Sequence, residues 1–129
     1  MNIAILSTYF PRECGIASFS KDLRNNLMLC GEKVSILAVS DKNGYYNYPP
    51  EVVFDLEEDN RDQYVIAAEF VNTANIDLVF VEHEYGIFGG NDGAFVLDFI
   101  ENLEKPFILN THTVLPSPDF HKRRILSTL

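Results

Sequence analysis

The chain has 129 residues, of which 47% are apolar and 22% are charged, and its formal net charge is -9. This length fits a single domain, because domains commonly have about 100–150 residues. The negative charge would repel nucleic-acid phosphates and anionic lipid, so we expect neither as a partner. No apolar run is long enough to span a membrane, and the N-terminus lacks the charged start of a signal peptide.

Two cysteines, Cys14 and Cys30, form no metal-binding or redox spacing. We expect both to be free, buried thiols in a reducing cytosol, and therefore predict a cytoplasmic protein.

The hydrophobic pattern predicts alternating strands and helices. Strands are expected at 3–6, 33–39, 52–56, 77–81 and 106–110, and helices at 16–30, 61–74, 94–103 and 121–129. This alternation predicts an α/β fold with a mostly parallel, Rossmann-like sheet and helices on both faces. Because no helix is predicted between strands 33–39 and 52–56, we expect strand 52–56 at the sheet edge. The last helix reaches the end of the sequence without a capping residue, as in a chain that has been cut.

Three segments that follow predicted strands are rich in polar residues and glycine: 7–15, 82–93 and 111–118. The right-handed crossover rule places all three along one edge of the sheet. Open α/β sheets bind their ligands at the carboxyl ends of the strands. Their convergence therefore predicts a binding site at this edge.

Several familiar catalytic motifs are absent. His83 and Glu84 are not followed by the second histidine of a zinc protease, because Ile87 stands at that position. The glycines match neither the dinucleotide pattern nor a phosphate loop, and there is no nucleophile elbow. We expect no metal site.

Glycines in two of these segments admit two interpretations. Gly15 opens the helix that starts at Ile16, and Gly89 and Gly90 precede another helix. Each could be a flexible helix start, or could let a ligand approach exposed backbone N–H groups at a positive helix end.

Histidines and acids follow the buried strands. His83 and His112 stand just past two strands, where one histidine is commonly structural but two together favour function, since imidazole titrates near neutral pH. Glu82 and Glu84 alternate along an extended segment, so one of them would face the site. We expect this to be Glu84, bound to a ligand or to loop backbone; the alternative for both acids is a solvated loop charge.

Three segments of the chain, in order, resemble bacterial family 4 (group 1) glycosyltransferases: Ile5–Phe19, His83–Gly90 and Asn110–Pro116. The resemblance implies a GT-B fold, in which two Rossmann-like domains face each other across a cleft. The amino-terminal domain of such enzymes mainly binds the acceptor, and the carboxyl-terminal domain binds the nucleotide-sugar donor. The family usually transfers glycosyl groups with retention of configuration and without an obligatory metal.

The resemblance also implies roles for individual residues. His112 matches the active-site histidine that contacts the transferred sugar, and Gly15 matches the glycine loop that approaches the donor phosphates. His83 and Glu84 fall in the acceptor-side wall. The remaining candidates for substrate contact in these segments are Ile16, Gly89, Gly90 and Thr111.

The donor-binding half of the family, with its paired glutamates, is absent from residues 1–129. We therefore expect the acceptor-side domain of a two-domain hexosyltransferase, inactive alone, whose partners are a nucleotide sugar, a sugar or polysaccharide acceptor and the missing carboxyl-terminal domain. No cofactor is expected, because the nucleotide sugar is a substrate. Two alternatives stay open: half of a sugar-nucleotide epimerase, and a standalone Rossmann-like ligand-binding or regulatory domain.

Overall fold

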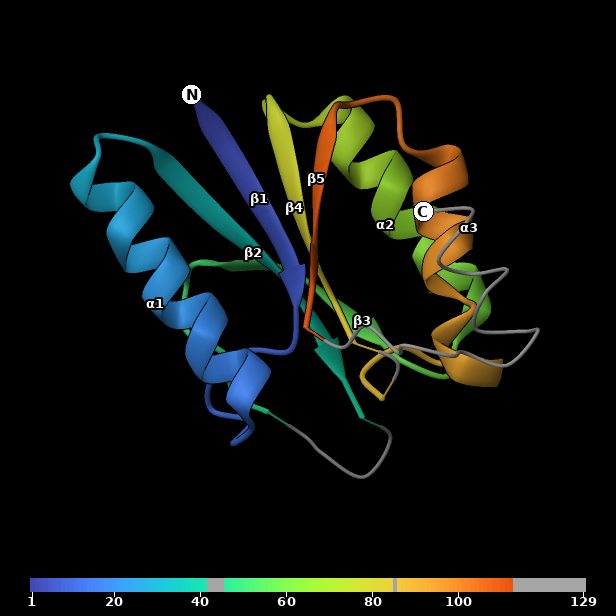
Figure 1. Ribbon diagram of the computed structural model, residues 1–129. Helices are drawn as coiled ribbons and strands as arrows, with labels where there is room; N and C mark the ends of the chain where they lie inside the picture. Colours follow the sequence, from blue (N-terminus) through green and yellow to red (C-terminus); the bar gives the residue numbers. More distant parts are fainter. Residues whose placement is uncertain (42–45, 85, 113–129) are drawn as a thin grey trace.

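The computed structural model describes residues 1–41, 46–84 and 86–112, apart from the side chain of Asp92, and forms one layered α/β unit (Figure 1). The strands are β1 (Asn2–Ser7), β2 (Lys33–Ser40), β3 (Val52–Glu57), β4 (Leu78–His83) and β5 (Phe107–Thr111). The helices are α1 (Gly15–Leu29), α2 (Arg61–Thr73) and α3 (Val96–Asn102), with a short 3-10 turn, η1 (Asn91–Gly93), before α3. The predicted helix 121–129 and most of segment 111–118 lie outside the described residues.

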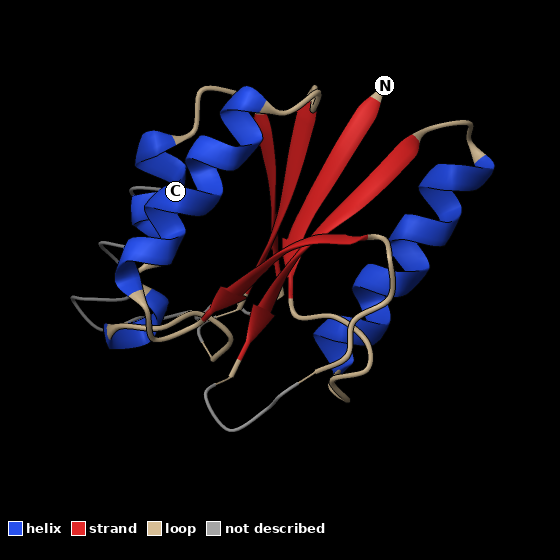
Figure 2. Ribbon diagram, turned by 180° about the vertical axis from the view of Figure 1, so that it is seen from behind, coloured by secondary structure: helices blue, strands red, loops and turns tan. Residues whose placement is uncertain are grey.

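The five strands form a parallel sheet in the order β3-β2-β1-β4-β5. The predicted α/β class with a Rossmann-like parallel sheet is confirmed, as is the place of β3 at an edge. Helix α1 covers one face, whereas α2 and α3 cover the other (Figures 1 and 2). Because all strands run the same way, their carboxyl ends lie at a single edge of the sheet.

The core has two layers, one on each side of the sheet. On the α2 and α3 side, Leu6, Leu37 and Val81 pack with Tyr64 and Phe99, all of them fully buried. The layer under α1 is made of alternate residues of the same strands and side chains of the helix: Ile3, Ile5, Val34, Ile36, Ala38, Leu23 and Leu27. Period-two alternation in the strands thus divides the apolar residues between the two faces.

Two element boundaries differ from the prediction by two residues, whereas the others among the described residues agree within one residue. Strand β4 continues through Glu82 and His83, which were expected in a loop, because the pairing with β5 continues to Asn110 and Thr111. The predicted helix 94–103 begins later, after η1. Gly90 and Gly93 have φ of +81° and +78°, which interrupts regular helix here.

The expected burial of the cysteines was wrong. Cys14 is half-buried at the start of α1, where its Sγ accepts a hydrogen bond from Ala17 N, and Cys30 is exposed at the end of that helix. Both thiols are free. Within the described part of the chain, no helix has the length and apolar character needed to cross a bilayer.

Candidate functional site

A buried carboxyl group holds two polar side chains where β4 and β5 end. Glu82 is fully buried, and its Oε1 accepts a hydrogen bond from Asn110 Nδ2 at 3.0 Å. Its Oε2 lies 2.9 Å from His112 Nε2. The pairing of Glu82 with Asn110 in the β4–β5 ladder puts both side chains on the same face, and His112 follows two positions later.

His112 is held at three points. Its ring bonds Glu82, its backbone N–H donates to His83 O at 2.8 Å, and its ring meets Phe19 of α1 edge to face, with centroids 4.7 Å apart. The side chain keeps 19% of its surface exposed, so a ligand can reach it. Among the described residues, no hydrogen bond engages Nδ1.

His83 is placed differently from His112. It is the last residue of β4, it is fully buried, and its ring stacks on Phe88 with centroids 6.1 Å apart. Burial lowers the pKa of His83 below its ordinary value, opposed by Glu84 and assisted by His112. The His83 imidazole is therefore neutral and packs beneath the surface at this edge of the sheet. In this conformation it has no exposed surface for a ligand to contact.

The loop after β4 forms an internal hydrogen bond and packs closely against neighbouring segments. Glu84 Oε2 accepts a hydrogen bond from Gly86 N at 2.9 Å, so the carboxylate bonds loop backbone, one of its two expected partners. A Cβ at Gly89 would lie 1.9 Å from the carbonyl oxygen of Glu58, and one at Gly90 would lie 2.7 Å from the ring of Phe95. Packing alone therefore requires glycine at both positions.

The other candidates lie along the same edge. Gly15 is the exposed first residue of α1, and a Cβ added there would meet nothing within 4 Å. Ile16 packs against the core, and exposed Thr111 ends β5 opposite His83. Space at Gly15 leaves the N-terminus of α1 accessible, whereas Ile16 is mainly a packing residue.

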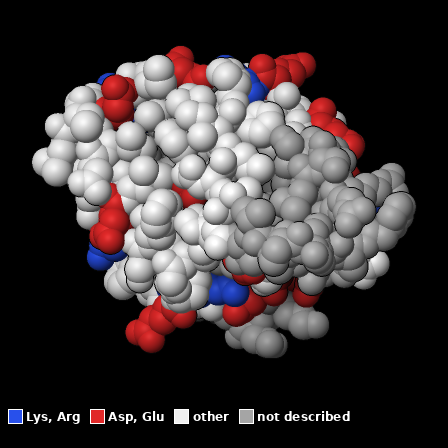
Figure 3. Space-filling model, in the orientation of Figure 1, with Lys and Arg blue, Asp and Glu red and all other residues white. Residues whose placement is uncertain are grey.

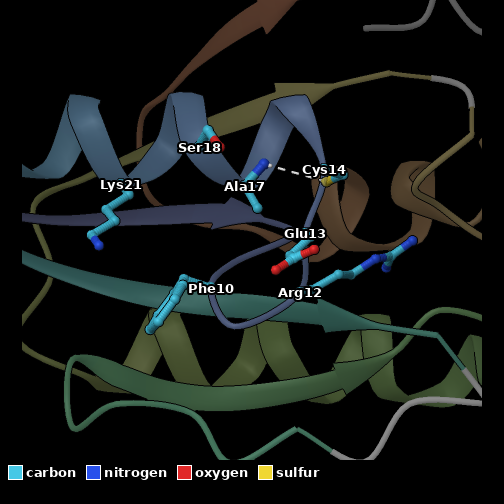
Figure 4. Close-up of a pocket in the computed structure, with 7 residues that line it drawn as sticks. All are labelled: Phe10, Arg12, Glu13, Cys14, Ala17, Ser18 and Lys21. Atoms are coloured by element: carbon cyan, nitrogen blue, oxygen red, sulfur yellow. Dashed lines mark hydrogen bonds between the residues drawn. The ribbon is translucent and has the colours of Figure 1, made fainter.

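A pocket of about 280 Å³ lies between the β1–α1 loop and the first two turns of α1 (Figure 4). Its lining consists of Phe10, Arg12, Glu13, Cys14, Ala17, Ser18 and Lys21. The ammonium of Lys21 stands 4.6 Å from the centroid of the Phe10 ring. The lining includes none of Gly15, His83 and His112, although the β1–α1 loop places the pocket at the same edge of the sheet.

Sequence reasoning missed two residues of the His112 cluster. Glu82, rather than Glu84, contacts the histidine, and Phe19 supplies the ring that packs on it. The alternation of side chains along a strand could have indicated Glu82. Residues 80 and 82 lie on one face of the sheet, as do residues 110 and 112. Phe19 gave no such signal, because its half-exposed position in α1 is set by tertiary packing.

In Figure 3 the surface between α1 and the residues drawn in grey is mainly uncharged, and most of the visible Asp and Glu side chains lie at its margin. Among the residues that the structure describes, no three His, Cys, Asp or Glu side chains are grouped as a metal ion would need.

No protein-family model and no curated protein sequence matches the chain. A solved structure does: an α-glucosyltransferase in complex with UDP and a 13-mer DNA containing a central A:G mismatch. The TM-score is 0.60 at 14% sequence identity, and the match covers 99% of this chain but 35% of that protein. The chain thus spans about a third of that enzyme. By fold, it is an α/β, Rossmann-like unit similar to part of a GT-B glycosyltransferase.

Proposed function

We propose that this chain is the acceptor-side, amino-terminal domain of a retaining glycosyltransferase, which moves a sugar from a nucleotide-sugar donor to an acceptor hydroxyl. The observation that carries the proposal is the placement of His112. It stands at the carboxyl end of β5, bonded to buried Glu82 yet 19% exposed. Ligands of open α/β sheets bind at this edge, and the fold similarity to part of a GT-B glycosyltransferase supports the same assignment.

In the proposed reaction the acceptor oxygen attacks the anomeric carbon. The bond from that carbon to the diphosphate oxygen breaks, the nucleoside diphosphate leaves, and the acceptor proton is released. His112 contacts the transferred sugar and stabilises developing charge rather than acting as a nucleophile. Gly15 leaves the positive end of α1 open toward the donor phosphates.

The reaction needs groups on both sides of the reacting bond. We therefore propose that a donor-binding, carboxyl-terminal domain completes the cleft, and that residues 1–129 alone have little or no transferase activity. No cofactor takes part, since the nucleotide sugar is itself consumed. The cytoplasm remains the compartment that we expect.

The test uses the full-length natural polypeptide that carries this domain, incubated with a panel of nucleotide sugars and acceptors. His112→Ala should lower kcat by about 10²- to 10³-fold, the cost of removing one group that stabilises transition-state charge. Thermal unfolding should stay near that of the wild type. The matched control, Glu69→Gln, changes an exposed side chain on α2 and should leave kcat unchanged. Unchanged turnover in His112→Ala would overturn the proposed role.

The same material separates the two alternatives. A sugar-nucleotide epimerase would change a labelled donor without any acceptor present, whereas a transferase would not. A standalone ligand-binding domain would bind nucleotide sugars tightly by itself. Tight binding measured by titrating residues 1–129 would therefore contradict the division between acceptor and donor domains.

A further inference from the structure

Glu82 is an unusual residue to find inside the sheet. It is fully buried, two positions after Phe80, which belongs to the apolar layer under α1. Removing a carboxylate from water costs several kcal/mol unless hydrogen bonds replace the lost hydration. Among the described residues, no Lys or Arg pairs with Glu82; both of its oxygens are used by Asn110 and His112.

We infer that Glu82 is a positioning residue for His112, an inference that rests on the proposed function. An ionised carboxylate can only accept hydrogen bonds, so with Glu82 ionised its contact with His112 requires a proton on Nε2. The bond formed by one ring nitrogen decides the state of the other. Glu82 therefore selects the Nε2–H form and leaves Nδ1 as the nitrogen that meets the sugar.

The surrounding contacts support a fixed ring. Asn110 holds the second oxygen of Glu82, so the carboxyl group cannot rotate freely. The bond from His112 N to His83 O fixes the backbone, and Phe19 packs against the ring. A reacting group that is held in place avoids an entropic cost when the transition state forms.

A purely structural role is the alternative, because the same contacts join edge strand β5 to β4. The two roles predict different results for Glu82→Leu. A strand tether predicts a loss of stability and nothing more, and such a loss is expected whenever one partner of a buried pair is removed. A positioning role predicts lost turnover whatever the stability.

The kinetic experiment uses the full-length polypeptide with Glu82→Leu and Glu82→Gln, and Glu69→Gln as the control. Loss of the partner of a functional histidine in metal sites costs about 10- to 100-fold, and we expect kcat to fall by that factor. KM should change little, and Glu69→Gln should match the wild type. A wild-type kcat in Glu82→Leu would overturn the inference while leaving the proposed function intact.

A double-mutant cycle then tests whether Glu82 acts through His112. If it does, adding Glu82→Leu to His112→Ala should lower kcat no further, because residues that act as one unit are non-additive. Additive losses would show that Glu82 acts independently, which contradicts a positioning role.

A third measurement does not depend on activity. Nitrogen-15 spectra of the imidazoles in residues 1–129, with His112→Gln used for assignment, report which ring nitrogen carries the proton. We expect Nε2–H in the wild type and a mixed or Nδ1–H form in Glu82→Leu. Nδ1–H in the wild type would overturn the inference. If the full-length protein transfers no sugar, the proposed function fails, whereas these spectra still decide the arrangement of Glu82 and His112.

Discussion

The backbone N–H of Gly89 donates a hydrogen bond to the phenolic oxygen of Tyr64, 3.0 Å away in the core. That hydroxyl in turn donates to the carbonyl oxygen of Glu58 at 2.8 Å. The loop after β4 is therefore anchored to α2 and to the turn that precedes this helix. Its glycines permit the close backbone approach, which gives them a packing role whether or not a ligand also meets them.

Gly89→Ala should destabilise the fold. The new Cβ would lie 1.9 Å from Glu58 O and 3.0 Å from the ring of Phe95, and the first of these contacts is with backbone. Overpacking of this kind costs about 1–3 kcal/mol. Urea denaturation followed by circular dichroism measures the change. Gly15→Ala is the matched control, since open space there predicts a change within about 0.5 kcal/mol; equal losses in both variants would contradict the packing role of Gly89.

Burial of His83 predicts a loss of stability in acid. In the folded protein the pKa of His83 is lowered below 6.5, mainly because burial removes the imidazole from water. Below about pH 6.5 the unfolded chain therefore takes up a proton that the folded protein does not, and stability falls as the pH falls. Unfolding free energies of the wild type and His83→Gln, measured from pH 7.5 to 5, should show a flatter slope in the variant. Parallel slopes would mean that another group causes the acid sensitivity.

Burial of Tyr9 predicts that stability also falls in base, as the pH rises. Burial raises the pKa of Tyr9 from 10.0 to about 12, helped by the hydrogen bond that its hydroxyl donates to Glu51 Oε2 at 2.8 Å. Between about pH 10 and 12 the unfolded chain loses this proton while the folded protein keeps it, so stability declines as the pH rises. Tyr9→Phe should remove part of that decline, measured by thermal unfolding at pH 9 to 11.5. An unchanged decline would exclude Tyr9 as its source.

Local pattern predicted most of the framework. The stripe of Tyr64, Ala67, Ala68 and Val71 predicted the buried face of α2, and these four side chains are fully buried. The absence of a helix between β2 and β3 predicted the place of β3 at the edge. Element boundaries were less accurate at β4, because the pairing of His83 with Thr111 comes from a neighbouring strand rather than from local sequence.

By itself, the sequence determined the α/β class, the parallel sheet and the edge at which its polar segments gather, because periodicity and crossover handedness are local or general properties of the chain. Only the tertiary structure decided which side chains meet there. Glu82 contacts His112, which is 30 positions away in the sequence, and Phe19 packs on the imidazole ring of His112. The tertiary structure also showed that Gly89 and Gly90 are required by packing. Such contacts depend on the register between strands and on how separate layers pack. The short-range hydrophobic pattern of a sequence carries no information about either.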